Sequence, residues 1–514
     1  MVTDASASLS ILNKYRQGLP CLSLTTEIAM LGKENIRLIF GFKIKQIRQE
    51  KGLSLSDLAQ KTGISVSYLN EIEKGKKYPQ AEKIAVLADA LGVSYDWLVS
   101  LKLSKKLSPL GNLLQSNFLN DFPLEVFGIE PAQFVEILAN APDKMGAFIS
   151  TLAEIARSYD MRIEEFYFSV LRSYQEMYEN YFPDLEEEVK NFRKSISQEQ
   201  ESFLPTELLA SILEQKYQFT IQYTAFEGVL GNLRSVLKGK TLLINNQLSE
   251  EQRRFVLARE IGYNFLKIKT RAYTFSWVEV HSFDEVLNNF KASYFAGALL
   301  LPEALLREDL TIFFQQKYFD AKMLLGYLKT YCVSPETFLY RCSNLLPRFF
   351  DLNEIFFLRF DDTDGQFNLT KEMHLSGLHN PHASALGEHY CRRWISISIL
   401  QSLQNQKLLN NEVLCQAQIS DYYDSPNQYL VIAMARSLSP TPAHSSLAIG
   451  IKINEKSSKI IHFLRDKNIT RKKVGETCER CSAQNCQERV AKPSILEKER
   501  YKQARRQAIK HLLQ

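Results

Sequence analysis

Three cysteines near the C-terminal end of the sequence have the spacing of a metal or cluster site. Cys478, Cys481 and Cys486 lie within nine residues, and the first two form a Cys-x2-Cys turn. Such a turn lets two sulfur atoms converge on one point, and thiolates bind both zinc and iron–sulfur clusters. The spacing alone predicts a metal-binding segment without separating structural zinc from a cluster. Unligated surface thiols are the alternative interpretation.

A fourth ligand is needed to complete such a site, and Cys391 is the preferred candidate. It lies beside aromatic and basic residues in the run His389-Tyr390-Cys391-Arg392-Arg393-Trp394. Cys415 lies in an apolar run and is expected to pack as a small hydrophobic residue. His389 or His382 could take the place of Cys391. The predicted ligand set is Cys391, Cys478, Cys481 and Cys486.

A second group of residues has the arrangement of a DNA-reading helix. Ser65–Gly75 is predicted to be the third of five short helices, with Leu69 and Ile72 facing the core. Asn70 can pair with adenine, and Glu71 can accept a hydrogen bond from cytosine. The residues expected near the base edges are Val66, Ser67, Asn70 and Glu71. Ser65, which caps the helix, is also expected to be a DNA-binding residue, and those expected to contact phosphates are Lys74, Lys76 and Lys77.

Local signals predict how this helix is positioned. Ser54 and Asp57 form a capping box that begins the second helix, Gly63 ends it, and Pro79 precedes the fourth. The stretch from Gly41 to Leu98 closely resembles the lambda-repressor-like (Xre) helix-turn-helix family. Leu55 departs from that family, which often has a DNA-contacting Gln at this place. A helical bundle used only for protein contacts is the alternative interpretation.

Two segments in the middle of the chain, Phe255–Phe265 and Lys291–Pro302, resemble the zinc-peptidase-like domain of the ImmA/IrrE family. That family binds zinc through two histidines four residues apart on one helix, with a glutamate between them as general base. A third ligand, usually glutamate, comes from the later helix. The resemblance implies a helical, zincin-like fold.

The metal ligands of that family are missing here. Arg259 and Tyr263 stand where the histidines should be, Lys291 stands at the third position, and only Glu260 is retained. Cations repel a divalent metal, and tyrosine with its high pKa is a poor ligand. We therefore expect no peptidase activity, an ion pair at Glu260 with its arginine neighbour, and a domain that acts as a scaffold.

The order of these features resembles the short-chain fatty acyl regulators over nearly the whole chain after residue 35. That resemblance implies an effector of the acyl-CoA type and a [4Fe–4S] cluster on the four cysteines, with structural zinc as the alternative. Arg392, Arg393 and the run Arg471-Lys472-Lys473 could meet the phosphates of a CoA. Each of them could equally be a solvated charge or a contact to the DNA backbone.

At the level of whole elements, the sequence predicts a mainly α multidomain protein: a lambda-repressor-like helix-turn-helix, a helical zincin-like (ImmA/IrrE) middle and an α/β C-terminal sensor domain. Strands are expected at 354–360, 429–435 and 447–453, and a short one at 241–245. The predicted intervals are 1–40 (tail), 41–100 (helix-turn-helix), 101–195 (helical linker), 196–347 (degenerate ImmA/IrrE-like), 348–490 (sensor with the cysteines) and 491–514 (basic helix).

Composition and charge narrow the class of protein. The 514 residues are 45% hydrophobic and 24% charged, which is ordinary for a globular protein. The net charge of +5 is uneven, with +4 on residues 41–80, +10 on residues 452–514 and about −9 on the rest. The longest apolar runs are far shorter than the ~20 residues that span a bilayer, and the N-terminal residues do not resemble a secretory signal. We expect a cytoplasmic protein with its cysteines reduced or metal-bound.

These observations predict a sequence-specific, DNA-binding transcriptional regulator, not an enzyme. We expect a homodimer or higher homo-oligomer on a double-stranded DNA operator, a small-molecule or redox signal at the C-terminal domain, and no membrane partner. Two alternatives come from other classes. One is an ImmA-like metallopeptidase that cleaves a repressor, and the other is an antitoxin or phage-type interaction regulator.

Overall fold

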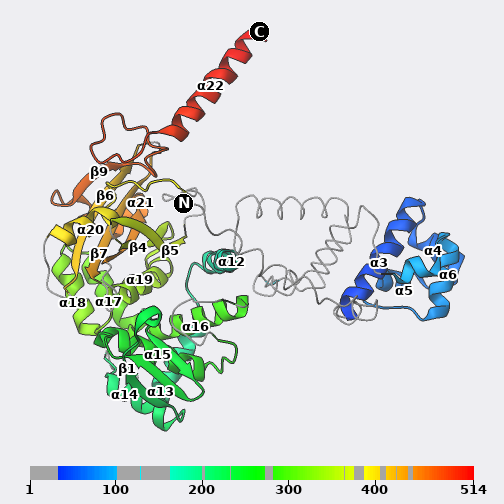
Figure 1. Cartoon of the computed structure of the whole chain (residues 1–514), viewed down its shortest axis with the longest axis horizontal. Coiled ribbons are helices and arrows are strands. Elements are labelled where there is room, and N and C mark those ends of the chain that lie inside the picture. The colour runs from blue at the N-terminus through cyan, green and yellow to red at the C-terminus, as the bar shows by residue number, and fades with distance from the viewer. Residues whose placement is uncertain are drawn as a thin grey trace, which may run out of the picture. The chain divides into compact units, whose positions relative to one another are not determined.

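The computed structural model describes most of the chain in two compact units, Met1–Ile163 and Glu164–Gln514 (Figure 1). Much of the predicted linker, residues 101–127 and 129–162, lies outside the described residues, as do 1–32 and the candidate ligand His382. The described residues are 33–100, 128, 163–198, 203–231, 233–271, 280, 282–363, 365–375, 387–405, 412–423, 425–437 and 444–513.

The first unit contains a five-helix bundle in which the caps predicted from the sequence are present. Ser54 and Asp57 exchange the two hydrogen bonds of a capping box, and Gly63 ends the same helix in the left-handed conformation. Ser65 accepts a hydrogen bond from the Tyr68 backbone at the start of the next helix. The helices are α3 (Lys33–Glu50), α4 (Leu55–Thr62), α5 (Val66–Glu73), α6 (Ala81–Leu91) and α7 (Tyr95–Val99).

The bundle begins earlier than the sequence predicted. A tail was expected up to residue 40, but α3 starts at Lys33, and Ile39 and Phe40 are buried. Phe40 belongs to the same apolar core as Leu58, Leu69, Ile72 and Leu87. The tail prediction was wrong for residues 33–40 because their apolar residues continue the helical period of the residues that follow.

The middle of the second unit is mainly helical. Its long helices α15 (Glu250–Phe265) and α16 (Phe283–Leu300) pack closely, because Gly262 has no side chain to separate it from Phe295 and from the Ala292 backbone. The flanking helices are α12 (Ile163–Met177), α13 (Pro183–Ser195), α14 (Thr206–Gln215), α17 (Glu303–Phe314), α18 (Ala321–Tyr331) and α19 (Pro335–Phe350).

Helix α13 belongs to this unit through a buried ion pair. Glu186 on α13 accepts two hydrogen bonds from Arg341 on α19, at 2.6 and 2.9 Å, and one from the Tyr294 hydroxyl at 2.6 Å. Residues 164–195 therefore pack with the middle domain, although the sequence assigned them to the linker. The prediction of a linker is corrected for residues 164–195. Their helical periodicity predicted an apolar face but not the domain against which that face packs.

A small sheet accompanies these helices. It has the order β1 (Thr220–Thr224), β3 (Thr241–Asn245) and β2 (Ser235–Lys238), with β1 parallel and β2 antiparallel to β3. Only β3 was predicted from the sequence. β1 is largely exposed and β2 has only four residues, so neither has a clear hydrophobic pattern.

The C-terminal part is a six-stranded sheet in the order β5-β4-β8-β7-β6-β9. Neighbouring strands are antiparallel except β6 and β9. Three strands were predicted from the sequence, and β5, β6 and β9 were missed. The strands are β4 (Ile355–Thr363), β5 (Gln366–His374), β6 (Leu414–Tyr422), β7 (Gln428–Ser437), β8 (His444–Lys452) and β9 (Thr470–Val474).

Helices cover both faces of this sheet. α20 (Ile395–Asn405) packs on the face that carries Phe356, Leu358 and Phe360. α19 lies against the opposite face, where Tyr340 meets Phe357 with the two ring centroids 5.5 Å apart. The α/β C-terminal domain predicted from the sequence is thus confirmed, and its second face is shared with the middle domain.

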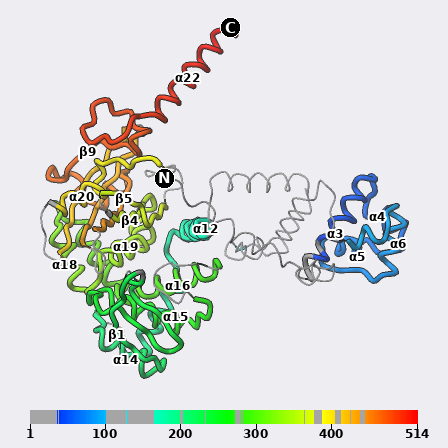
Figure 2. Tube along the Cα trace, viewed as in Figure 1, coloured from blue at the N-terminus to red at the C-terminus, as the bar shows by residue number. Residues whose placement is uncertain are grey.

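The last helix, α22 (Ser494–Leu512), follows two short elements, α21 (Glu455–Ile460) and the 3-10 turn His462–Arg465, and then the cysteine segment. The Cα trace in Figure 2 shows α22 leaving the sheet domain, and none of its residues is buried. Within the described residues, no helix is both long enough and apolar enough to pass through a bilayer.

Candidate functional site

The predicted DNA-reading residues lie on and beside α5. Ser65, Val66, Ser67 and Asn70 are exposed, whereas Glu71 is half-buried. Lys76 and Lys77 are exposed beyond the end of the helix, and Lys74 is half-buried. Leu69 and Ile72 are fully buried, so α5 has one face in the core and one free for a groove.

A buried ion pair holds α5 against α3. Arg48 donates to both carboxylate oxygens of Glu73, at 2.6 and 2.9 Å, and a third hydrogen bond goes to the Leu53 carbonyl at 2.7 Å. Paired geometry of this kind fixes orientation as well as contributing energy. This ion pair was not predicted from the sequence, although both residues stand in the stretch that resembles the helix-turn-helix family.

Lys43 ties the start of the bundle to its end. Its ammonium group donates to the Trp97 carbonyl at 2.6 Å and to the Ser100 hydroxyl at 3.0 Å, and it lies 4.6 Å from the Trp97 ring centroid. Burial lowers the pKa of Lys43 to about 8. The two ends of the bundle are therefore linked directly.

The position of the missing zinc ligands in the middle domain is filled by other side chains. Asn289 on α16 accepts hydrogen bonds from the Arg259 guanidinium at 3.1 Å and from the Tyr263 hydroxyl at 3.0 Å. The sequence assigned the third position to Lys291. That assignment is corrected, because Asn289, two residues earlier, is the side chain that faces Arg259 and Tyr263.

Glu260 forms an ion pair, as expected, but with a different arginine. Arg271 donates to both of its carboxylate oxygens, at 2.6 and 2.5 Å, and lies 4.0 Å from the Tyr263 ring centroid. Burial lowers the pKa of Arg259 to about 10, so it stays charged at neutral pH, and burial raises the pKa of Tyr263. Two guanidinium groups and a protonated tyrosine do not fit a zinc ion.

A second polar cluster lies where the middle domain meets the six-stranded sheet. Glu336 on α19 is 3.1 Å from Arg359, 3.5 Å from Lys371 and 3.8 Å from Arg234, measured between carboxylate oxygen and nitrogen. Arg359 and Lys371 are opposite each other on β4 and β5, although like charges in this position repel. We call this group the seam cluster: Arg234, Glu336, Arg359, Asp361, Lys371, Arg436 and Ser445.

The seam cluster has more positive than negative charge. Burial alone would raise the pKa of Glu336, but the charges of Arg359, Lys371 and Arg234 lower it overall, whereas burial lowers the pKa of Lys371. Ser445 pairs in register with Asp361 and with Arg436, is 1% exposed, and has a hydroxyl with no hydrogen-bond partner among the described residues. Four cations, two carboxylates and an unsatisfied hydroxyl thus meet in one half-buried place.

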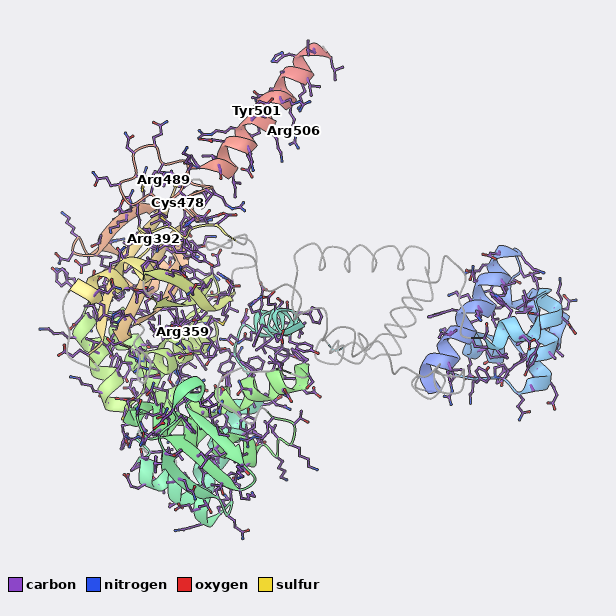
Figure 3. All side chains as sticks on the ribbon, in the orientation of Figure 1. Arg359, Arg392, Cys478, Arg489, Tyr501 and Arg506 are labelled. Carbon is purple, nitrogen blue, oxygen red and sulfur yellow. The ribbon has the colours of Figure 1, made fainter. Side chains whose placement is uncertain are left out.

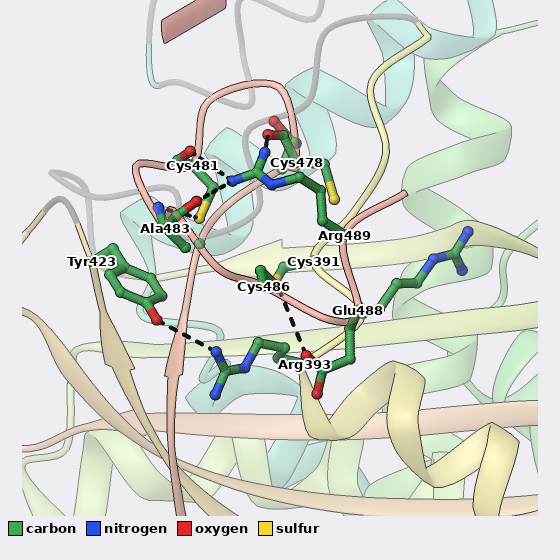
Figure 4. Close-up of a pocket in the computed structure, with 12 residues that line it drawn as sticks. Cys391, Arg393, Tyr423, Cys478, Cys481, Ala483, Cys486, Glu488 and Arg489 are labelled. Atoms are coloured by element: carbon green, nitrogen blue, oxygen red, sulfur yellow. Dashed lines mark hydrogen bonds between the residues drawn. The ribbon is translucent and has the colours of Figure 1, made fainter. Parts of the chain in front are cut away.

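The four predicted cysteine ligands line one pocket at the end of the six-stranded sheet (Figure 4). Cys391, Cys478 and Cys481 are buried, and Cys486 is half-buried. Among the described residues, no group of three or more His, Cys, Asp or Glu side chains is arranged to hold a metal ion. The thiols are therefore gathered in one pocket without converging on a single point.

A strap around residues 388–391 carries Cys391 to the other three cysteines. The Cys478 amide donates to the His389 carbonyl at 2.8 Å, and the Cys391 amide donates to the Glu476 carbonyl at 3.2 Å. Glu388 adds an ion pair to Arg480 at 2.6 Å. Backbone pairing thus explains how two segments almost ninety residues apart form one pocket.

Arg489 organises the loop that holds the clustered cysteines. Its guanidinium donates to the carbonyls of Cys478, Ala483 and Cys481, at 2.6, 2.7 and 3.1 Å (Figure 4). Gly475 allows Cys481 to approach, since a side chain there would lie 2.7 Å from its sulfur. This role of Arg489 could not be predicted from the sequence, because one arginine in a basic segment carries no signal of a loop that closes around it.

The pocket also contains unsatisfied cationic groups. Arg392 Nη1 and Arg393 Nε are buried without a hydrogen-bond partner among the described residues. Burial raises the pKa of the Cys391 thiol to about 11. Four thiolates would be costly to bury alone, and nearby guanidinium groups would offset part of that charge.

Comparisons with known proteins fit the two domains that the geometry distinguishes. A family model described as helix-turn-helix matches residues 44–98, and one described as the IrrE N-terminal-like domain matches residues 214–343. The HTH-type transcriptional regulator YazB of Bacillus subtilis is 43% identical over 60 residues, which are 87% of its length and 12% of this chain. The chain belongs to the HTH-type transcriptional regulators.

Two further relatives match stretches of similar length, and one solved structure aligns over a larger share of this regulator. The uncharacterized HTH-type regulator y4dJ of Sinorhizobium fredii is 35% identical over 66 residues, 86% of its length and 13% of this chain. A solved structure described as a Mycobacterium tuberculosis transcriptional regulator aligns over 63% of this chain and 93% of its own, with 16% identity and a TM-score of 0.45. SinR of Bacillus subtilis is 40% identical over 65 residues, 59% of its length and 12% of this chain. The two family matches together show that this regulator combines an Xre-type DNA-binding domain with an IrrE-like domain.

Proposed function

We propose that this regulator is a cytoplasmic, sequence-specific transcription factor whose C-terminal domain holds a [4Fe–4S] cluster and responds to an anionic effector of the acyl-CoA type. The observation that carries the proposal is the pocket lined by all four cysteines, beside arginine nitrogens that have no partner among the described residues. Proteins hold such clusters with four cysteine thiolates.

We prefer a cluster to a single zinc ion because the chain resembles the short-chain fatty acyl regulators, and that resemblance implies a [4Fe–4S] cluster. For zinc, at a zinc–sulfur distance of about 2.3 Å, four sulfurs would have to converge within about 4 Å of one another. The described side chains are not arranged in this way around an ion. When bound, a cluster would cross-link the strap to the cysteine loop and change charge on oxidation or reduction.

The seam cluster supports the effector part of the proposal. An excess of two positive charges and the Ser445 hydroxyl, which has no partner among the described residues, suit a ligand with phosphate or carboxylate groups. The cluster residues come from the IrrE-like domain and from the sheet domain, so a ligand there would bridge the two. Any response of the DNA reader requires that the effector bind two conformations of the chain with different affinity.

The IrrE-like domain takes no catalytic part in this proposal. Glu260 is paired with Arg271, and the positions around it carry Arg259, Tyr263 and Asn289. Glu260 is therefore not available as a general base beside a metal ion. We propose that the regulator is not a peptidase.

The reader would act as a dimer on two half-sites in successive major grooves. Asn70 is the residue best suited to reading a base, since its amide can pair with adenine. In selection of binding sites from a random pool, Asn70→Ala should lower discrimination at one base position by about 1–3 kcal/mol. Gln80→Ala, at the exposed start of α6, is the control. If the Asn70→Ala and Gln80→Ala variants selected sequences with the same base preferences, this role of Asn70 would be contradicted.

The cluster is tested on protein purified without oxygen. Brown protein with iron and acid-labile sulfide in equal amounts, about four of each per chain, is the expected result. A colourless protein with one zinc per chain would overturn the cluster and leave a structural zinc site. A colourless protein free of both metals would overturn metal binding altogether.

The effector is tested by measuring DNA binding with and without short-chain acyl-CoAs. A change in affinity is expected for the parent and should be lost in Arg359→Gln. The matched control is Lys456→Gln, because Lys456 forms an exposed pair with Asp351 away from the seam cluster. If no acyl-CoA changes DNA affinity, the effector proposal fails, while the DNA-binding domain is unaffected.

A further inference from the structure

The C-terminal helix α22 has an unusual combination of features: it is long, charged and unpacked. None of its 19 residues is buried, and Tyr501 and Leu512 are 71% and 85% exposed. Figure 3 labels Tyr501 and Arg506 on the part of α22 that extends away from the sheet domain. A helix with no tertiary packing usually needs a partner to be stable.

The charges of α22 form an ordered row. It carries six Lys or Arg against Glu497 and Glu499. Four of these cations are spaced every fourth residue and so lie along one slanting line on the helix surface: Lys498, Lys502, Arg506 and Lys510. In the described part of the chain, none of the four makes an ion pair.

The row is locally unfavourable. Each consecutive pair places like charges at i and i+4, which destabilises a helix. The row also covers about 18 Å of helix, at 1.5 Å per residue. A polyanion lying along the row would remove the repulsion and would form an ion contact at each step.

We propose that α22 is a second DNA-contacting element, which binds the phosphate backbone through Lys498, Lys502, Arg506 and Lys510. The chain belongs to DNA-binding regulators, so a polyanion of this kind is present whenever the regulator acts. Phosphate contacts carry no base information but add affinity and position a protein on the duplex. α22 therefore strengthens and orients binding, while α5 supplies the sequence specificity.

The test measures how DNA affinity depends on salt for the full chain. The probe is a duplex of random sequence several helical turns long, so no operator needs to be known. Removing one phosphate-binding cation should reduce the slope of log K against log salt by about 0.9. Changing all four residues to Gln, which keeps the helix, should therefore reduce the slope by about 3–4 and weaken binding at least tenfold at low salt.

The controls separate this proposal from its alternatives. Gln503→Ala with Gln507→Ala changes the same helix away from the row and should leave the slope unchanged. An unchanged slope in the four-Gln variant would overturn the proposal. So would a variant that alters sedimentation but not the slope, because α22 would then be a surface for self-association. Asn70→Ala serves as the contrast, since it should lower base discrimination and leave the slope intact.

Discussion

The regulator contains two places that the sequence marks as candidate or degenerate metal sites, and the structure fills them with different side chains. Between α15 and α16, the positions of a zinc site are occupied by Arg259, Tyr263 and Asn289, which are joined by hydrogen bonds. In the cysteine pocket, by contrast, all four candidate ligands are thiols, and they line one space.

The two places differ in the side chains that surround the candidate metal position. A buried carboxylate must be compensated, and in the IrrE-like domain Arg271 supplies the positive charge at Glu260. In the cysteine pocket, the four thiols are side chains that bind zinc and iron–sulfur clusters as thiolates. We therefore expect the site between α15 and α16 to bind no metal and the cysteine pocket to bind a metal or cluster.

The largest effect is expected when the cysteines that line the pocket are substituted. Cys478→Ser and Cys391→Ser should each lower bound iron at least tenfold, because each removes one of four cluster ligands. Iron is measured on protein purified without oxygen. Cys415→Ser, which changes a buried thiol of β6 outside the pocket, should keep full iron. Full iron in Cys391→Ser would show that another residue is the fourth ligand.

Introducing metal ligands between α15 and α16 should create a zinc site there. The combined change of Arg259→His, Tyr263→His and Asn289→Glu would supply two histidines and a carboxylate on the facing helices, and about one zinc per chain should then bind. Binding is measured by zinc titration in a Cys478→Ser background. A variant with Gln, Phe and Gln at the same three positions should bind none, and equal binding by both would contradict the assignment of these positions.

Breaking the internal pair should cost stability rather than activity. Arg271→Ala leaves Glu260, which is 3% exposed, as an uncompensated buried charge, so the free energy of unfolding should fall by about 3–5 kcal/mol. Denaturant titration measures the change. Lys456→Ala breaks an exposed pair and should cost less than about 1 kcal/mol. If both substitutions lowered the free energy of unfolding by the same small amount, Arg271 would not be the group that compensates the charge of Glu260.

The smallest expected effect is on acid stability. Burial raises the pKa of Glu186, but Arg341 and its hydrogen bonds lower it overall. A carboxylate with a lowered folded-state pKa stabilises the fold above its unfolded value, near 4.5, and this stabilisation is lost as the pH falls below it. Glu186→Gln should therefore flatten the loss of stability below about pH 4.5. Unfolding is followed from about pH 6 to about pH 3, across that pKa, and a parallel decline in both proteins would contradict the prediction.

Several parts of the molecule could be predicted because their signals are local. The caps at Ser54, Gly63 and Ser65 depend on neighbouring residues, and the burial of Leu69 and Ile72 follows from helical spacing. The strands β4, β7 and β8 are apolar runs. β5 and β9 were missed because edge strands with polar or basic residues resemble loops.

Contacts between distant segments could not be predicted in the same way. The ion pairs of Arg48 with Glu73, of Glu186 with Arg341 and of Glu260 with Arg271 depend on which helices pack together. The seam cluster gathers residues from 234 to 445, none of which forms a motif in sequence. Charges brought together by packing leave no trace in local composition.

The sequence by itself determined the helix-turn-helix with its exposed third helix and the absence of histidines from the zinc-ligand positions of the IrrE-like domain, and it named the four cysteines that line one pocket. Only the tertiary structure decided that Asn289 bonds to Arg259, that Arg271 pairs with Glu260, and that Arg489 closes the cysteine loop. The physical reason is the range of the interactions. Helix caps and periodicity act over a few residues, whereas compensation of buried charge is set by whichever group the packing brings within hydrogen-bond distance.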